Sequence, residues 1–170
     1  MLRLRPFVPA DASAVVGWIT DERMFREWSA DRYDHYPITE DDILAQYGPF
    51  AGTGAFFPMT AEDETGPAGH LILRWLDDAR TDLRFGFIIV DPAKRGKGYG
   101  REMLRLAQIF AFDVLKAARV SLGVFAQNLP AVHCYRAAGF READAEPEIF
   151  AILGERWTCV EMEITKAGGA

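Results

Sequence analysis

Residues 83–100 read LRFGFIIVDPAKRGKGYG, and this stretch organises the interpretation of the whole chain. Its first part is a run of aromatic and β-branched residues, which predicts a buried strand. Asp91 and Pro92 end that strand, because proline cannot donate a hydrogen bond to a sheet and disfavours helical backbone before it. The glycines of the following RGKGYG segment leave backbone N–H groups free and tolerate positive φ angles.

A strand, a glycine loop and a helix start in this order form a binding site for an anion, because free amides and the helix dipole both favour negative charge. The ligand is therefore expected to carry phosphate. A dinucleotide loop beginning at Gly96 would need glycine at position 101, where the chain has Arg101. A nucleotide P-loop would need Ser or Thr after Lys97, where the chain has Gly98. The pattern that fits is R-x-x-G-x-G.

A second motif follows further along the chain, N-x-x-A-x-x-x-Y-x-x-x-G-F. Its named positions are all filled, by Asn128, Ala131, Tyr135, Gly139 and Phe140. With both motifs present, the chain resembles the GNAT superfamily of N-acetyltransferases. The resemblance is close over residues 83–141 and extends to the flanks only through the order of the elements.

Composition places limits on the class of protein. The 170 residues, 49% of them hydrophobic, suffice for one well-packed core, so we expect a single domain over 1–170. A net charge of −6 argues against nucleic acid as a partner. Two cysteines cannot make a disulfide framework, and no secretory or membrane-spanning segment is evident, so we expect a cytoplasmic protein without a membrane partner.

Hydrophobic periodicity predicts the remaining elements. Helices are expected over 12–20, after an Asp21 cap, over 41–47 with a Thr39/Asp42 capping box, from the glycine loop to Ala117, and after an Asn128 cap. Strands are expected over 2–7, 55–61, 69–75, 83–90, 119–125, 148–153 and 156–164, the last two joined by a type II′ turn at Gly154-Glu155. This order matches a GNAT fold: an α/β protein with a mixed, mostly antiparallel sheet of about seven strands and helices on both faces.

The resemblance implies acetyl-CoA as co-substrate, no metal, and an amine as acceptor. It places pantetheine along the backbone of Ile88, Ile89 and Val90, where the strand separates from its neighbour and a backbone amide can polarise the thioester. Asn128 either binds pantetheine, caps its helix, or does both. The diphosphate falls to the loop, in which the charged side chains either add to binding or are ordinary solvated cations: Arg95, Gly96, Lys97, Gly98, Tyr99, Gly100 and Arg101.

Tyr135 takes the place of the tyrosine that the family positions near the cofactor sulphur. A phenol with a pKa of about 10 stays protonated at neutral pH and can protonate a departing thiolate. We therefore expect Tyr135 to be the general acid. The structural alternative is a core tyrosine whose hydroxyl is satisfied by a carbonyl.

The general base has no obvious candidate, because Arg84 and Gly123 stand where family members carry a glutamate. Three options remain for removing the amine proton. Asp82 can act through water, a residue of the 31–36 loop can reach in, or the amine can arrive neutral and give its proton to water after attack.

An aromatic segment after the second helix is the candidate acceptor site, in which Trp28, Tyr33 and His35 would hold a cationic or aromatic amine. A lid packed on the sheet edge is equally compatible with this composition. A small-molecule amine is favoured over a protein N-terminus as acceptor. Family members that acetylate the N-terminus of a ribosomal protein can carry a glutamate at the position where this chain has Gly123. The alternative function is a non-catalytic acyl-CoA-binding module that acts as a sensor or scaffold. Both a monomer and a homodimer remain open.

Overall fold

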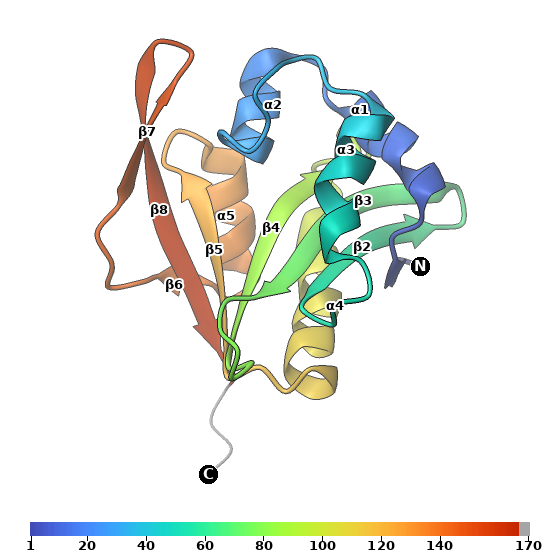
Figure 1. The fold of residues 1–170 in the computed structure, drawn as a ribbon. Coiled ribbons are helices and arrows are strands. Elements are labelled where there is room, and N and C mark those ends of the chain that lie inside the picture. The colour runs from blue at the N-terminus through green and yellow to red at the C-terminus, as the bar shows by residue number, and fades with distance from the viewer. Residues whose placement is uncertain (167–170) are drawn as a thin grey trace.

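The computed structural model describes residues 1–166. In this part the chain forms an eight-stranded sheet in the order β1-β2-β3-β4-β5-β8-β6, with β7 paired to β8 (Figure 1). Only the β4/β5 pair is parallel; the other pairs are antiparallel. The strands are β1 Arg3–Pro6, β2 Phe56–Asp63, β3 Gly66–Trp75, β4 Asp82–Val90, β5 Arg119–Phe125, β6 Arg141–Glu142, β7 Glu148–Ile152 and β8 Glu155–Thr165.

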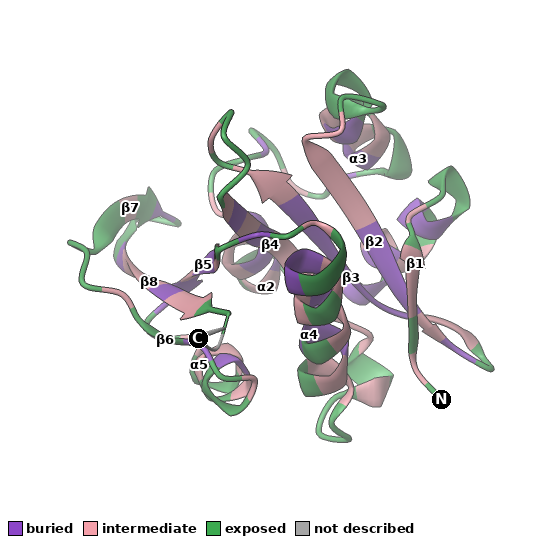
Figure 2. Ribbon diagram, turned by 90° about the horizontal axis from the view of Figure 1, so that it is seen from below, coloured by how far each residue is buried: buried purple, intermediate pink, exposed green. Residues whose placement is uncertain are grey.

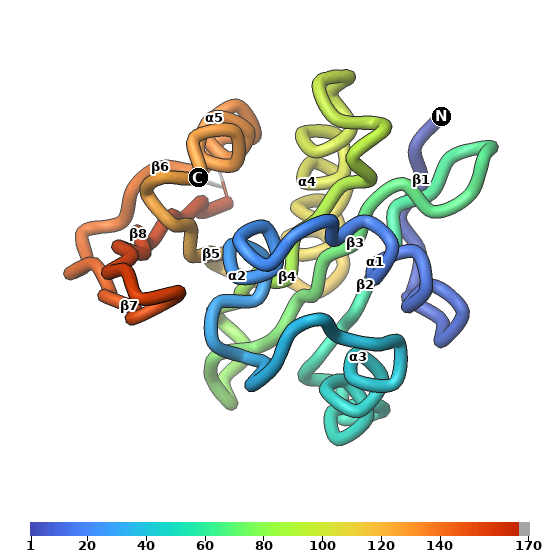
Figure 3. Tube along the Cα trace, turned by 90° about the horizontal axis from the view of Figure 1, so that it is seen from above, coloured from blue at the N-terminus to red at the C-terminus, as the bar shows by residue number. Residues whose placement is uncertain are grey.

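Helices cover both faces of the sheet (Figures 1 and 3). One face carries α1, α2 and α3, and the other carries α4 and α5. This is the α/β architecture that the resemblance implied, with eight strands rather than about seven. The helices are α1 Ala12–Trp18, α2 Glu22–Ser29, α3 Glu40–Tyr47, α4 Tyr99–Ile109 and α5 Leu129–Ala137, with short helical turns at Pro9–Asp11, Gly48–Phe50 and Pro92–Lys94.

The two faces of the sheet bury separate cores, and strand β3 shows how the sequence feeds both. Its successive side chains alternate in direction. Leu71 and Leu73 pack into the core under α4 and α5, whereas Ile72 packs into the core under α1 to α3. Figure 2 shows the buried residues running along the strands between the two helical layers.

The helix caps expected from the sequence are confirmed. Asp21 accepts a hydrogen bond from a backbone N–H in the first turn of α2 at 2.8 Å. Thr39 and Asp42 form the reciprocal capping box of α3, and Asn128 accepts from the first turn of α5 at 3.4 Å. Satisfying these otherwise unpaired donors fixes where each helix begins.

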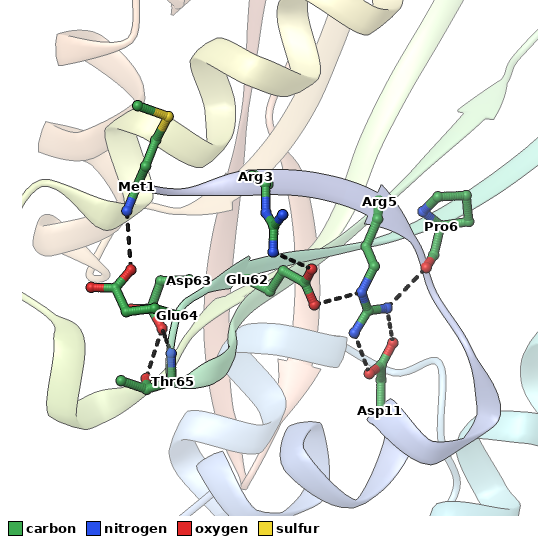
Figure 4. A network of polar contacts seen from close by, with 9 residues as sticks. All are labelled: Met1, Arg3, Arg5, Pro6, Asp11, Glu62, Asp63, Glu64 and Thr65. Atoms are coloured by element: carbon green, nitrogen blue, oxygen red, sulfur yellow. Dashed lines mark hydrogen bonds and ion pairs between the residues drawn. The ribbon is translucent and has the colours of Figure 1, made fainter.

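Polar contacts fasten the N-terminal strand to its surroundings (Figure 4). Arg5 binds both carboxylate oxygens of Asp11, at 2.7 and 2.9 Å, and its Nε donates to Glu62 of β2 at 2.7 Å. Burial opposes the charge on Asp11, but the hydrogen bonds that it accepts, led by those from Arg5, keep its pKa below the usual range. The network therefore ties β1, the following helical turn and β2 together.

Three local expectations were wrong. The first is the helix predicted to run to Ala117. Its α-helical part ends at Ile109, and a π-helical turn follows over Phe110–Val114. A π-helical turn contains one residue more than an α-helical turn, and here Phe112 is buried in the core while Val114 is 61% exposed.

The second is the last hairpin, which turns at Leu153-Gly154 rather than at Gly154-Glu155. Both turn residues have positive φ, at 53° and 74°, which is the type I′ pattern that matches strand twist.

The third concerns the β2–β3 connection, because the expected strands over 55–61 and 69–75 left a long polar turn between them. The strands instead extend to Asp63 and from Gly66. Asp63 makes this tight turn possible, because it accepts from both the backbone N–H and the hydroxyl of Thr65, at 2.8 and 2.7 Å. The two-residue strand β6 had no counterpart in the expectation, since so short a segment carries no periodicity.

Candidate active site

Strands β4 and β5 separate partway along their length. They pair only at Asp82↔Arg119, Leu83↔Val120 and Arg84↔Ser121. Beyond that point β4 runs on to Val90 without β5 beside it, and Figure 1 shows the two strands diverging. The unpaired edge of β4 leaves backbone N–H and C=O groups free for a ligand.

A β-bulge lies on β4 within this opening. Gly86 pairs with Ile72 and Ile89 with His70, so two residues of β4 oppose one of β3. Phe87, one of the two, has φ of +48°. A bulky residue in this region costs about 1–3 kcal/mol, and such strain concentrates at functional sites. A bulge interrupts the regular pairing and changes the direction of the local backbone groups, and bulges are common next to active sites.

Each glycine of the loop after β4 has a distinct structural reason. Gly96 and Gly98 have φ of +73° and +84°, which glycine adopts without strain, and Gly98 is the N-cap of α4. Gly100 allows close packing, because a Cβ there would lie 3.0 Å from Sγ of Cys134 on α5. In the described part of the chain no side chain caps α4, so its first N–H groups remain free for an anion.

Asp63 holds the two ends of this loop. It accepts hydrogen bonds from Nζ of Lys94 and from the hydroxyl of Tyr99, both at 2.8 Å. The Lys94 ammonium, together with these hydrogen bonds, holds the pKa of Asp63 well below its usual range. The Tyr99 hydroxyl is thus engaged within the protein, and the loop is braced from β2.

The cations of the loop differ in their surroundings. Nε of Arg95 donates to the carbonyl of Val90 at 3.1 Å, closing the loop back onto the end of β4. Nζ of Lys97 donates to a backbone carbonyl within the loop, and Arg101 is exposed on the first turn of α4. All three stand beside the free amides.

Tyr135 lies on α5, 7% exposed, in the core between the sheet and α4. Its ring packs on Phe140, which in turn packs on Phe85 of β4, close to where the strands separate. Burial raises the pKa of Tyr135, so the phenol stays protonated at neutral pH. Within residues 1–166 its hydroxyl makes no hydrogen bond that would engage it structurally.

The structure brings two of the three expected acceptor residues to the bulge. Trp28 and Tyr33 are buried, stack on each other at 6.0 Å, and pack on Phe87 at 4.9 and 6.1 Å. Within the described residues, the indole N–H of Trp28 and the hydroxyl of Tyr33 are buried without a partner. His35 lies apart from them, exposed, with its ring nitrogens on Asp34 and Asp42, contacts that raise its pKa.

Helix α2 spans the opening from above (Figures 1 and 3). Its C-terminal part packs on β4 through Trp28. On the other side, Arg23 pairs with Glu155 at 3.2 Å and lies 5.0 Å from the ring of Trp157, both on β8. The helix therefore links the two sides of the separated sheet.

Asp82 stands at the closed end of the β4/β5 pair. Both of its oxygens accept from Arg119 at 3.1 Å, and Arg119 also binds Glu163 at 2.8 Å. The bulge at Ile88 lies about 20 Å further along β4 at the rise of a strand. Asp82 is therefore not brought together with the glycine loop, and a role in proton removal would have to pass through water.

Two charged residues at the site were not singled out from the sequence. Glu161 of β8 accepts from Nη1 of Arg84 at 2.5 Å, above Gly123. Arg74 of β3 stands directly opposite Arg84. In the sequence Glu161 lies between Val160 and Met162, an alternation that points it away from the core, whereas the position of Arg74 opposite Arg84 depends on the register of β3 on β4.

A groove of about 430 Å³ continues from Arg84 over β5 and β8. It does not reach the glycine loop. Acidic side chains dominate its lining, which consists of Arg84, Arg119, Ala143, Asp144, Ala145, Glu146, Glu148, Cys159, Glu161 and Glu163.

Fold and site together are those of an acyl-CoA-binding acetyltransferase domain. The sequence profile of the acetyltransferase (GNAT) family matches residues 21–140, and the chain belongs to this family.

Among characterised relatives, a spermidine N(1)-acetyltransferase from Vibrio cholerae is 36% identical over 67 residues. That alignment spans 39% of this chain and 39% of the relative. The crystal structure of spermidine N-acetyltransferase from V. cholerae in complex with CoA and spermine superposes with a TM-score of 0.82, at 24% identity over 96% of this chain and 95% of that one. A chimera of the V. cholerae enzyme with hSSAT gives a TM-score of 0.80, also at 24% identity, over 96% and 95% of the two chains. These superpositions establish the shared fold.

No helix within residues 1–166 is long and apolar enough to cross a membrane. In the same residues, the His, Cys, Asp and Glu side chains form no group of three or more placed to hold a metal ion.

Proposed function

We propose that this protein is an acetyl-CoA-dependent N-acetyltransferase that acts on a small-molecule primary amine. The observation that carries the proposal is the opening between β4 and β5, with a glycine loop and an uncapped helix N-terminus at one end and the Phe87 bulge within it. The family membership and the spermidine N-acetyltransferase relatives support the same reaction class.

The donor fits the residues that line this opening. The diphosphate would bind the free amides around Gly98 and Gly100, with Arg95, Lys97 and Arg101 adding positive charge. The pantetheine arm would follow the unpaired backbone of β4 through Ile88, Ile89 and Val90, much as an added strand does. Asn128, already the cap of α5, retains amide donors for this arm.

Acetyl transfer then requires the amine to form a C–N bond with the thioester carbonyl while the C–S bond breaks. Backbone N–H groups at the bulge would stabilise the developing oxyanion. Tyr135 would donate its proton to the thiolate, and its buried, protonated phenol suits this role. The amine's own proton would leave through water, toward Asp82 or the 31–36 loop.

Trp28 and Tyr33 would form the wall of the acceptor site. Their unpartnered N–H and O–H groups lie buried next to the bulge, where an acceptor or its water could satisfy them. His35 would act from the rim of the site, since it is exposed and held by two aspartates.

Steady-state release of CoA thiol from acetyl-CoA, measured with a panel of primary amines, tests the proposal. We expect amine-dependent turnover and a mass increase of one acetyl group in the product. Binding of acetyl-CoA without turnover on any amine would instead favour the sensor or scaffold function. Absence of binding would reject both.

A further inference from the structure

Two arginines face each other across strands β3 and β4. Arg74 and Arg84 are register partners, on the sheet face that α1 to α3 cover. The face follows from alternation: Arg74 lies two residues after Ile72, and Arg84 two residues before Gly86, whose missing Cβ would contact Ile72. Like charges directly opposite each other destabilise a sheet, so this pair needs compensation.

Of the two arginines, only Arg84 has an acidic partner among residues 1–166. Arg84 binds Glu161 at 2.5 Å and the hydroxyl of Ser121 at 3.4 Å. Arg74 makes no ion pair and no side-chain hydrogen bond with any of residues 1–166. It is nevertheless half-buried, and burial together with the nearby charges of Arg84 and Arg32 lowers its pKa.

Within residues 1–166, the three arginines at positions 74, 84 and 32 therefore carry excess positive charge, with Glu161 as the acidic side chain acting on Arg74. A half-buried cation without an ionic partner loses part of its hydration, and an anionic ligand would offset that loss. The position adjoins the candidate acceptor site, because Arg32 directly precedes Tyr33, whose ring packs on Phe87 and whose buried hydroxyl has no partner within residues 1–166.

The acidic groove on the other side of Arg84 is a weaker candidate for binding the acceptor's charge. Glu161 and Glu163 are already paired with arginines. The remaining acids on its rim are exposed, so water satisfies their charges: Asp144, Glu146 and Glu148. Among residues 1–166, Arg74 is the half-buried member of this region whose charge has no ionic partner.

We propose that Arg74, assisted by Arg32, binds a carboxylate carried by the acceptor, so that the substrate is an amino acid or a similar anionic amine. This deepens the proposed function and rests on it. It also separates this chain from the polyamine acetyltransferases that it resembles, since a polyamine presents only cations, which Arg74 would repel. A guanidinium binds a carboxylate through two parallel hydrogen bonds, and such pairs are strong when partly buried.

The test compares amines that differ only in the carboxylate: lysine with cadaverine, and phenylalanine with phenethylamine, with spermidine as a third kind of acceptor. We expect the carboxylate-bearing member of a pair to have the higher kcat/KM. In Arg74→Met that advantage should fall about 10- to 100-fold, mainly through KM, because a charged hydrogen-bond pair is lost. The kcat/KM of the member without the carboxylate should change less than about twofold in the same variant.

Arg105→Met is the matched control, because Arg105 lies exposed on α4 and, within residues 1–166, pairs only with Glu102. It should leave both members of each pair unchanged. Thermal melting of the variants verifies that they are folded. If Arg74→Met left the carboxylate preference unchanged, or if spermidine were preferred by the wild type, the inference would be wrong while the proposed function stood. If acetyl-CoA did not bind at all, both would fail together.

Discussion

The guanidinium of Arg84 lies over Gly123 at the point where β4 and β5 begin to separate. A Cβ on Gly123 would come within 2.8 Å of Nη2 of Arg84 and 2.9 Å of Sγ of Cys159. At these two positions the resemblance implied a catalytic glutamate, which this chain lacks. A side chain at 123 and the arginine at 84 exclude each other, and the carboxylate at this point, Glu161, is on β8 instead.

Gly123→Ala should therefore destabilise the protein by about 1–3 kcal/mol, the usual range for overpacking a tight site. Urea unfolding measures this free energy. The loss should shrink in an Arg84→Ala background, where one of the two contacts is gone. Gly17→Ala is the matched control: it lies in α1 with nothing within 4 Å of the added Cβ, and should raise stability by up to about 1 kcal/mol. Equal effects at both glycines would contradict the packing described for Arg84.

Gly100→Ala should weaken acetyl-CoA binding, because the added Cβ meets Sγ of Cys134 at 3.0 Å and pushes the start of α4 away from α5. Adding Cys134→Ala should restore affinity, since it removes that sulphur. Gly96→Ala provides the contrast: nothing lies near its Cβ, but its φ of +73° costs a non-glycine residue about 1–2 kcal/mol. Calorimetric titration with acetyl-CoA checks this for Gly100→Ala and Gly96→Ala, each alone and combined with Cys134→Ala. If Cys134→Ala also restored affinity to Gly96→Ala, the explanation by contact with the Cys134 sulphur would be wrong.

Tyr135→Phe should lower kcat by about 100-fold or more, the range for loss of a general acid. Affinity for acetyl-CoA and melting temperature should stay close to those of the wild type, because the hydroxyl makes no hydrogen bond with residues 1–166. Because burial raises the pKa of Tyr135, activity should show no loss up to about pH 10 that depends on this tyrosine. Unchanged turnover in the variant would remove Tyr135 from the mechanism.

His70 should make stability depend on pH. It is completely buried on β3, hydrogen-bonded to the Tyr47 hydroxyl at 2.8 Å, and burial lowers its pKa to about 4. In the unfolded chain the imidazole binds a proton near pH 6.5, so unfolding takes up a proton between these values. The contribution of neutral His70 to the free energy of unfolding is fully present above about pH 6.5. As the pH falls from 7 to 4.5, the free energy of unfolding should decrease by about 2–3 kcal/mol.

Urea unfolding across this range tests the expectation, and His70→Phe should flatten the profile. His133→Gln, a change at an exposed histidine of α5, should leave it unaltered. Asp11, the carboxylate within electrostatic reach of His70, has a lowered pKa and so adds its own loss of stability only toward more acidic pH. A profile identical in wild type and His70→Phe would show that the imidazole is not held neutral.

Much of the fold followed from local signals in the sequence. The Asp21, Thr39 and Asn128 caps begin their helices as expected, because capping depends on one side chain and the three residues after it. The positive φ at Gly96 and Gly98 likewise follows from the loop's composition. Signals of this kind need no knowledge of the partner strand.

What the sequence did not reveal depends on register. The continuous apolar run of β4 gave no sign of the bulge at Phe87, since both faces of the strand are buried and alternation is lost. The opposition of Arg74 to Arg84 likewise depends on how β3 pairs with β4. Pairing between distant strands is set by the whole core rather than by neighbouring residues.

The most direct test of the central claim is a calorimetric titration of the protein with acetyl-CoA, repeated with Gly98→Val. We expect saturable one-to-one binding to the wild type. We also expect a strong loss of affinity in the variant, because a β-branched residue cannot hold the +84° φ that opens the helix amides to the diphosphate. No heat of binding to the wild type, or equal affinity in the folded variant, would contradict it.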